Sequence, residues 1–147
     1  MRVKIVFLAI VGLGAPGVFG STIGAQQSAP SRSVLDGVYT EDQAGRGQAL
    51  YAQECSTCHG PALGGAEMAP PLAGPTFAAD WSGLSIGDLV DRIRVSMPVN
   101  DPGKLSRQQC ADIVSFMLKS GQFPAGKAEL PSEAEALKDI RFEAPKQ

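Results

Sequence analysis

The chain has 147 residues, among them 17 Gly, 11 Pro, 3 Cys and 1 His. This length is typical of one domain and excludes two full enzyme domains or a large barrel. The net charge of −2, from 13 basic and 15 acidic residues, argues against a nucleic-acid-binding surface, which needs a basic excess. The many Gly and Pro residues indicate extensive turns and loops.

Residues 1–25 have the layout of a secretory signal peptide, with a basic start, a short apolar run and small residues before the cleavage site. We expect cleavage after Ala25, with Gly20 as the alternative, and export to the periplasm. An uncleaved segment would instead anchor the protein in the membrane. Cleavage after Ala25 would remove Arg2 and Lys4, so the net charge would change from −2 to −4.

The polar residues 26–37 predict a flexible lead-in, and the folded domain is expected over residues 38–121. Thr40 is followed by Gln43 three residues later, which is the spacing of a capping box. We therefore predict a helix over Glu41–Glu54, ending directly before the cysteine motif.

Residues 55–59 read Cys-Ser-Thr-Cys-His, which is the signature of covalent c-type haem attachment. Cys55 and Cys58 are about one helical turn apart, so both sulfurs can face the same side and each can bond one vinyl group of a haem. His59 follows directly and would place its imidazole on the iron as the proximal ligand.

Three other interpretations of this motif fit the sequence less well. A structural zinc site needs four N or S ligands, and Cys110 is the only further thiol. A thiol–disulfide redox pair would need a βαβ pattern nearby, which the sequence lacks. A plain disulfide across two intervening residues is rarer still.

Three further stretches contribute to a family resemblance. They are Ala-Pro-Pro-Leu-Ala-Gly at 69–74, Met97-Pro98, and Phe-Pro-Ala-Gly-Lys-Ala-Glu-Leu-Pro at 123–131. Over about residues 38–120 the chain resembles the small, single-haem class I bacterial cytochromes c. It looks particularly like the cytochromes associated with quinone-cofactor (PQQ-type) alcohol dehydrogenases. The resemblance implies an all-α class I cytochrome c fold, with helices packed around one covalently attached haem c.

The resemblance also assigns roles to residues outside the attachment motif. Gly47, four residues before Tyr51, would let the first and last helices cross in near contact, with Phe116 as the aromatic facing Gly47. Family members keep such a glycine although it costs a helix about 1 kcal/mol relative to alanine.

Three cofactor-binding residues are likewise implied by the resemblance. The carbonyl of Pro70 would accept a hydrogen bond from the His59 ring and fix its orientation. Leu72 would pack against the haem face. Trp81 would hydrogen-bond a haem propionate, with a generic core aromatic as the alternative; Arg94 is a weaker candidate for the same group.

The stretch 60–80 shows no convincing periodicity, so we predict a loop that covers one haem face. A third helix is expected after it, because Ser85 and Asp88 have capping-box spacing. Leu84 and Leu89 occupy the staple positions on either side of this cap.

Met97-Pro98 ends the third helix and supplies the candidate for the sixth iron ligand. Met68 and Met117 are the alternatives, together with an open site. Met117 lies on the apolar stripe of the last helix and Met68 follows His59 on a short loop, whereas the resembling family carries its distal methionine in the setting of Met97. A thioether sulfur in this position raises the reduction potential.

The last helix is expected to begin after Ser106, which forms a capping box with Gln109. Leu105 and Cys110 are the staple pair, and Gly121 ends the helix. Cys110 is interpreted as a buried apolar residue, with a reactive thiol as the alternative.

Residues 122–147 form a C-terminal extension with a short helix predicted over Glu133–Ile140. The extension could pack on the domain or dock on a partner, and the sequence does not decide between them.

These observations predict a periplasmic one-electron carrier, without catalytic residues and without a small-molecule substrate, with His59 and Met97 on the iron. The expected partners are redox proteins: a periplasmic dehydrogenase, a terminal oxidase or another cytochrome. A fixed electron-relay subunit of a dehydrogenase complex and a haem-based ligand sensor are the alternatives.

Overall fold

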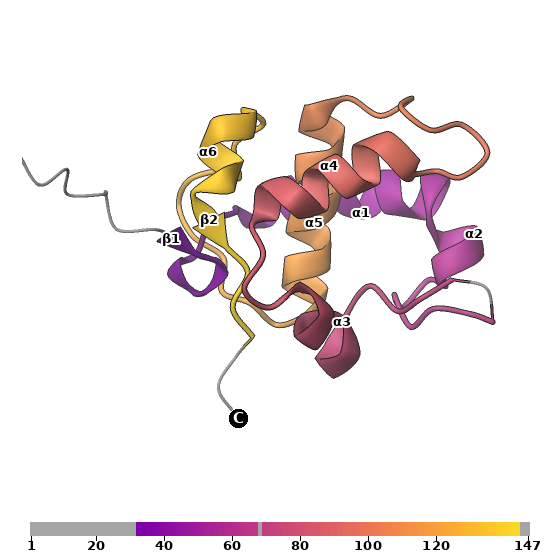
Figure 1. Ribbon diagram of the computed structural model, residues 1–147, viewed down its shortest axis with the longest axis horizontal. Coiled ribbons are helices and arrows are strands. Elements are labelled where there is room, and N and C mark those ends of the chain that lie inside the picture. The colour runs from indigo at the N-terminus through magenta and orange to yellow at the C-terminus, as the bar shows by residue number, and fades with distance from the viewer. Residues whose placement is uncertain (1–31, 68, 145–147) are drawn as a thin grey trace, which may run out of the picture.

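The computed structural model describes residues 32–67 and 69–144, so the predicted signal peptide lies outside the described residues. The fold is all-α, as predicted, with one additional pair of two-residue strands (Figure 1). None of the helices in the described ranges is long and apolar enough to cross a bilayer. In chain order the elements are β1 (Arg32–Ser33), the 3-10 turn η1 (Val34–Asp36), α1 (Glu41–Glu54), α2 (Ser56–His59), α3 (Gly74–Trp81), α4 (Ile86–Ser96), α5 (Arg107–Ser120), α6 (Ala134–Lys138) and β2 (Ile140–Arg141).

The crossing of α1 and α5 is the centre of the fold, and Gly47 makes it possible. A Cβ atom added to Gly47 would lie 1.8 Å from the carbonyl oxygen of Asp112. The two helices therefore meet backbone to backbone. The atoms nearest to an added Cβ at Gly47 belong to the backbone of Asp112 and Ile113. The ring of Phe116, which was predicted to face Gly47, packs against Tyr51 on the same helix, with centroids 5.3 Å apart.

Two of the three predicted capping boxes are present. Ser85 and Asp88 bond reciprocally at the start of α4, and Ser106 and Gln109 do so at the start of α5. At α1 only half of the box forms: Thr40 accepts from the backbone of Gln43. The predicted reciprocal bond is missing because the Gln43 side chain is fully buried and bonds elsewhere.

One other local expectation is wrong. The stretch predicted as loop contains α3, which begins at Gly74 with Pro75 in its first turn, a favoured position for proline because its missing N–H is not needed there. Of the predicted staple pair, Leu84 is 45% exposed and Leu89 is buried.

Residues 32–37 are part of the folded molecule, contrary to the predicted flexible lead-in; residues 26–31 lie outside the described residues. β1 pairs in parallel with β2, and Val34 is fully buried. The N-terminal segment is thus held by the C-terminal extension (Figure 1).

The extension packs on the domain and forms part of its core. Phe142 is fully buried and makes edge-to-face contacts with Phe77 and Phe123, at 5.7 and 5.2 Å between centroids. Leu137 and Ile140 are also fully buried. The short helix runs over Ala134–Lys138, within the predicted range.

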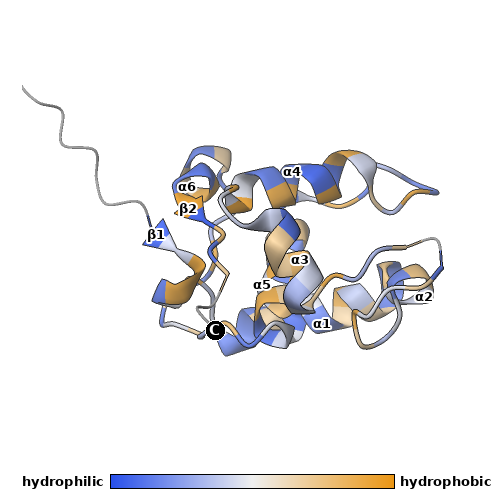
Figure 2. Cartoon of the chain, turned by 60° about the horizontal axis from the view of Figure 1, so that its bottom comes forward, coloured by the Kyte–Doolittle hydropathy of each residue, from blue (hydrophilic) through white to orange (hydrophobic). Residues whose placement is uncertain are grey.

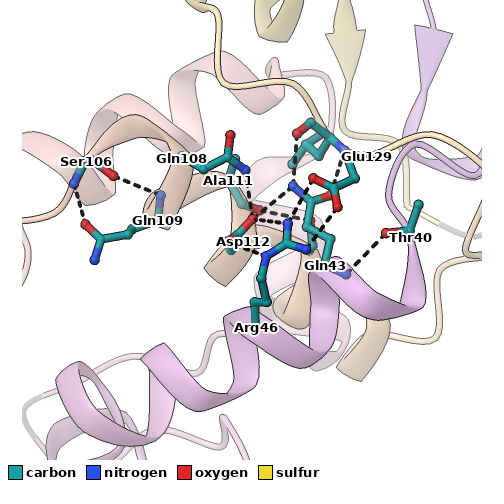
Figure 3. Close-up of polar contacts among 11 residues, drawn as sticks. Thr40, Gln43, Arg46, Ser106, Gln108, Gln109, Ala111, Asp112 and Glu129 are labelled. Atoms are coloured by element: carbon teal, nitrogen blue, oxygen red, sulfur yellow. Dashed lines mark hydrogen bonds and ion pairs between the residues drawn. The ribbon is translucent and has the colours of Figure 1, made fainter.

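A polar network ties the extension to the helix crossing (Figure 3). Asp112 accepts hydrogen bonds from Gln43, Arg46 and Gln108, and Arg46 also makes two bonds to Glu129. The Gln43 amide exchanges bonds of 2.6 and 3.0 Å with the backbone of Leu130. Buried Asp112 is therefore paired and hydrogen-bonded, as a buried charge must be.

Candidate functional site

A cavity of about 1440 Å³ lies between two parts of the chain. α4 and the turn after it form one wall, and α2 with the loop leading to α3 forms another (Figure 1). Typical small-ligand pockets have volumes of about 300–1,000 Å³, so this cavity is large enough for a large cofactor. Its wall includes all seven residues predicted to bind the cofactor: Cys55, Cys58, His59, Pro70, Leu72, Trp81 and Met97.

The two cysteines are placed by the junction between α1 and α2. α1 ends at Glu54, and the carbonyl of Cys55 then accepts hydrogen bonds from the backbone N–H groups of Cys58 and His59. Cys55 is partly buried and Cys58 is exposed, and no cysteine of the chain forms a disulfide. Burial, with a smaller contribution from Glu54, raises the pKa of the Cys55 thiol to about 11, so this thiol is protonated at neutral pH.

The orientation of His59 is fixed by one hydrogen bond. The residue is 8% exposed, and Nδ1 lies 2.9 Å from the carbonyl oxygen of Pro70. A carbonyl can only accept, so Nδ1 carries a proton, and in the neutral ring this leaves the lone pair on Nε2. This is the tautomer that a metal ligand requires, with the second nitrogen held by the backbone.

The loop after His59 is tightly folded, and this brings the Pro70 carbonyl to the ring. Gly65 donates to the His59 carbonyl at 2.9 Å and has a φ of +77°, which favours glycine. A Cβ at Gly65 would lie 2.6 Å from the carbonyl oxygen of Ala69. Farther along, the Leu72 N–H donates to the carbonyl of Leu63 at 2.8 Å.

Tyr51 holds the same loop from the α1 side. Its hydroxyl donates to the carbonyl of Gly60 at 2.6 Å, directly after His59 in the chain. Gly60 has a φ of +75°, where the chain turns out of α2. Burial raises the pKa of Tyr51 to about 12, with a smaller contribution from the nearby Cys55.

Met97 caps the C-terminal end of α4 in an extended conformation, and its N–H donates to the Ile93 carbonyl. Met117 also lines the cavity but is buried in α5 with 3% exposure. Met68, the third candidate, lies outside the described residues. The structure thus brings Met97 and His59 to the wall of one cavity from different elements.

The other wall residues are both apolar and polar, and the polar ones are Gln53, Glu54, Thr57, Glu67, Asp80, Arg92, Ser96 and Asn100. Trp81 is partly buried and its ring lies 6.1 Å from that of Phe77. Leu89, Ile93 and Ile113 belong to the apolar part of the lining. A wall that carries one imidazole, the thioethers of Met97 and Met117, two thiols and several apolar side chains fits a covalently attached haem and its two axial positions.

Arg92 is a wall residue that the sequence analysis missed, since it singled out Arg94. The helical spacing could have predicted this position. Arg92 is three residues after Leu89 and four before Ser96, so the three side chains share one face of the helix, and all of them line the cavity. Arg94 is two positions away and points to another side of the helix; it is absent from the lining.

The zinc interpretation finds no support within residues 32–67 and 69–144, where no cluster of three or more His, Cys, Asp or Glu could hold a metal ion. Cys110 is fully buried in α5, and this burial raises its pKa to about 11. A buried, protonated thiol is a poor nucleophile.

Comparison with known proteins gives one family and one solved structure. The family described as Cytochrome C oxidase, cbb3-type, subunit III matches residues 42–117, just over half of the chain. No curated protein matches. The crystal structure of the sulfane dehydrogenase SoxCD from Paracoccus pantotrophus is similar, with 22% identity and a TM-score of 0.49, covering 90% of this chain and 68% of that chain. Similarity at this level says nothing about function.

Proposed function

Because the chain belongs to the cytochrome c family described as cbb3-type cytochrome c oxidase subunit III, we propose that it is a periplasmic one-electron carrier. It accepts electrons from a periplasmic dehydrogenase and passes them to a terminal oxidase or another cytochrome. Family membership itself means a covalently bound c-type haem and haem-based electron transfer. The observation that supports the proposal is the single cavity whose wall holds Cys55, Cys58, His59 and Met97.

In this proposal each of the four residues has one task. The sulfurs of Cys55 and Cys58 hold the haem through thioether bonds, and Nε2 of His59 is the proximal iron ligand. The Pro70 carbonyl, 2.9 Å from Nδ1, keeps the imidazole in the required tautomer and orientation. Met97 supplies the thioether sulfur at the sixth position, which favours the ferrous state relative to a second imidazole.

The same ligand set explains why the site carries electrons and performs no reaction on a substrate. A filled sixth position leaves no site at the metal for oxygen or a substrate. The haem supplies the change between ferric and ferrous iron, and the chain controls it through ligands, burial and hydrogen bonds.

Electron exchange takes place at the opening of the cavity, because tunnelling rates fall steeply with distance. Cys58 is exposed on one side of this opening, and Val99 is exposed on the other. A redox partner therefore has to touch this edge, and such encounters use small interfaces.

The placement in the periplasm is supported by the sequence of residues 1–25, which has the layout of a signal peptide. The relay-subunit alternative was motivated by the extension, in which Phe142 and Leu137 are buried in the core while Glu135 and Lys138 are exposed. The sensor alternative requires that carbon monoxide displace Met97 readily.

An affinity pull-down from native periplasm tests the proposal. The haem-loaded protein is expected to retain a dehydrogenase, and that enzyme with its substrate should reduce this haem in a single-turnover assay. Failure of every retained protein to exchange electrons would contradict the carrier role. Rapid, stoichiometric binding of carbon monoxide to the reduced protein would favour the sensor instead.

A further inference from the structure

Met97, the candidate for the sixth iron ligand, lies at the start of an exposed turn. α4 ends at Ser96, and the N–H of Met97 donates to the carbonyl of Ile93. Residues 99–104 are all exposed, and the chain is buried again only at Leu105. A segment with so few buried contacts opens at little cost in free energy. The contacts that hold this turn therefore affect how firmly Met97 is held.

Within the described ranges, the hydrogen bonds of residues 98–104 run between residues of the turn itself. The Asp101 N–H donates to the Pro98 carbonyl at 2.9 Å, and the Lys104 N–H donates to the Asp101 carbonyl at 3.4 Å. These bonds shape the turn but do not attach it to another element. Figure 2 shows the turn, with its hydrophilic tip, projecting on the same side of the molecule as α2.

One ion pair joins the turn to the end of α1. Nζ of Lys104 lies 2.7 Å from Oε2 of Glu54, whose side chain is 20% exposed. Glu54 is the last residue of α1, directly before Cys55, and it lines the same cavity as Met97. The hydrogen bond to Glu54 raises the pKa of Lys104, with a smaller contribution from Asp101, so the ammonium group is charged at neutral pH. The pair thus links the segment that carries Met97 to the segment that carries the attachment cysteines.

A second ion pair near the turn has a different position. Arg107 pairs with Asp91 at 2.9 Å, which joins the first residue of α5 to α4. The turn connects these same two helices, so this pair closes the base of the turn and does not tie the turn to α1. Among the ion pairs of the described residues, the one between Lys104 and Glu54 alone reaches from the turn to the attachment motif.

We propose that Lys104 and Glu54 are positioning residues for Met97: their ion pair holds the turn after α4 against the end of α1 and so keeps the Met97 sulfur at the sixth position of the iron. This proposal rests on the proposed function, in which His59 and Met97 are the axial ligands. Neither Lys104 nor Glu54 is a ligand, and both act through the backbone of the turn. Ligation by His and Met raises the reduction potential, which means that the thioether binds ferrous iron more tightly than ferric iron. The ion pair therefore matters most in the ferric protein.

The expected size of the effect follows from the exposure of the pair. The Lys104 side chain is 40% exposed, and an ion pair at such a position changes an equilibrium constant by no more than about two- to fivefold. The pair therefore sets how often Met97 leaves the iron, and it does not decide whether Met97 binds. Loss of either charge should raise the fraction of ferric protein without the Met97 bond by about two- to fivefold. A neutral ligand that competes for this position should then bind more tightly by the same factor.

Titration of the oxidised, haem-loaded protein with imidazole, followed by absorbance, tests the proposal. The bond from the iron to the Met97 sulfur breaks, a bond from the iron to an imidazole nitrogen forms, and no electron is transferred. At about pH 8 an imidazole group, with a pKa of about 6.5, is neutral, so the charge of the protein does not attract or repel it. Lys104→Gln and Glu54→Gln should each bind imidazole about two- to fivefold more tightly than the unmodified protein.

Lys119→Gln is the matched control. Lys119 pairs with Glu41 at 2.6 Å, between the end of α5 and the start of α1, and neither residue lines the cavity. Lys119→Gln and Lys104→Gln change the net charge equally, and each breaks one exposed ion pair, so a difference between them reports the position of the pair. Lys119→Gln should bind imidazole as the unmodified protein does. Denaturant unfolding should give the two variants similar midpoints, which would show that the difference in imidazole affinity is local.

A double variant and a salt series show whether the two charges act as a pair. Lys104→Gln/Glu54→Gln should bind imidazole about as tightly as either single variant, because one interaction can be lost only once. At about 1 M salt, where screening acts over about 3 Å, the affinity of the unmodified protein should approach that of Lys104→Gln. The same salt should change the affinity of Lys104→Gln much less, because this variant has already lost the pair.

Three results would overturn the proposal. Equal imidazole affinities of Lys104→Gln and Lys119→Gln would show that Met97 is held without this ion pair, and the carrier role would remain intact. Additive effects of Lys104→Gln and Glu54→Gln in the double variant would show that the two residues act separately. An unmodified protein that binds imidazole as tightly as Met97→Ala would show that Met97 is not the sixth ligand, which would contradict the proposed function as well.

Discussion

Met97 and His59 approach the cavity from elements that are far apart in the sequence, and this arrangement gives the site its chemistry. The attachment motif could be predicted because Cys55, Cys58 and His59 are contiguous and their spacing is specific. The bond from the His59 ring to Pro70 was available only from the resemblance, and it is present in the structure.

Residues whose partners are distant in sequence could not be predicted. Gln43 was assigned to a helix cap, but its side chain bonds to Leu130, which is 87 residues away. Nothing in the local pattern of α1 indicates that contact. Arg92 was missed for a different reason, because the helical spacing that places it on the cavity wall was not applied to charged residues.

Met97→Ala tests the assignment of the sixth ligand. With the thioether removed, the reduced protein should bind one carbon monoxide per haem, and its reduction potential should fall because the ferrous state loses a favourable ligand. Titration with carbon monoxide followed by absorbance checks this. Met117→Leu is the control; it should bind no carbon monoxide and cost less than about 1.5 kcal/mol of stability. The assignment is wrong if both variants behave alike.

Tyr51→Phe tests how the loop after the haem motif is held. Loss of the bond to Gly60 should cost about 1 kcal/mol of unfolding free energy at neutral pH. Burial raises the Tyr51 pKa from 10.0 to about 12, so the folded state favours the neutral phenol. The stabilisation that the neutral phenol of Tyr51 gives to the folded state is complete below pH 10 and disappears as the pH rises through about 12.

Denaturant unfolding of both proteins from pH 8 to pH 12 provides the measurement. The unmodified protein should lose stability over the upper part of this range, and the variant should lose less. Identical pH profiles for the two proteins would show that burial does not raise the pKa of Tyr51 in the folded state.

At the level of elements, helices with complete local signals were predicted well. α1 has the predicted bounds, and α4 and α5 start at their predicted caps, because a cap and its partner three residues later are local features. α3 was missed because it is short and because it starts at Gly74-Pro75. Gly and Pro are typical of turns, so their presence indicated a loop at this position.

The helix crossing gives a prediction with a control in the same helix. Gly47→Ala places a methyl group against the Asp112 carbonyl, so the helices must separate, which should cost about 1–3 kcal/mol or more. Gly45→Ala, where the added Cβ meets no atom within 4 Å, should stabilise by about 0.5–1 kcal/mol. Thermal unfolding of the two variants is the test, and destabilisation by both would contradict the described crossing.

At the level of the whole molecule, the fold includes both flanks of the predicted domain. The sequence pattern indicated a lead-in before residue 38 and an extension after residue 121, whereas β1 and β2 pair and bury Val34 between elements from both ends. Two strands of two residues each are too short to show an alternating pattern in the sequence. This is why residues 32–37 were predicted as part of a flexible lead-in.

Leu137→Ala tests whether the extension belongs to the core. Leu137 is fully buried, so its truncation should cost about 2–5 kcal/mol. Ala136→Ser, at the preceding exposed residue, should change stability by less than about 0.5 kcal/mol. Unfolding of the haem-loaded protein followed by circular dichroism compares them; equal stabilities would mean that the extension is peripheral.

The central claim is that a haem is bonded to Cys55 and Cys58, and intact mass spectrometry of the mature protein tests it most directly. We predict a mass equal to the polypeptide plus one haem, which persists under denaturing conditions and disappears in the Cys55→Ala/Cys58→Ala variant. A mass equal to the polypeptide alone, from cells that attach haem to other cytochromes, would contradict the account.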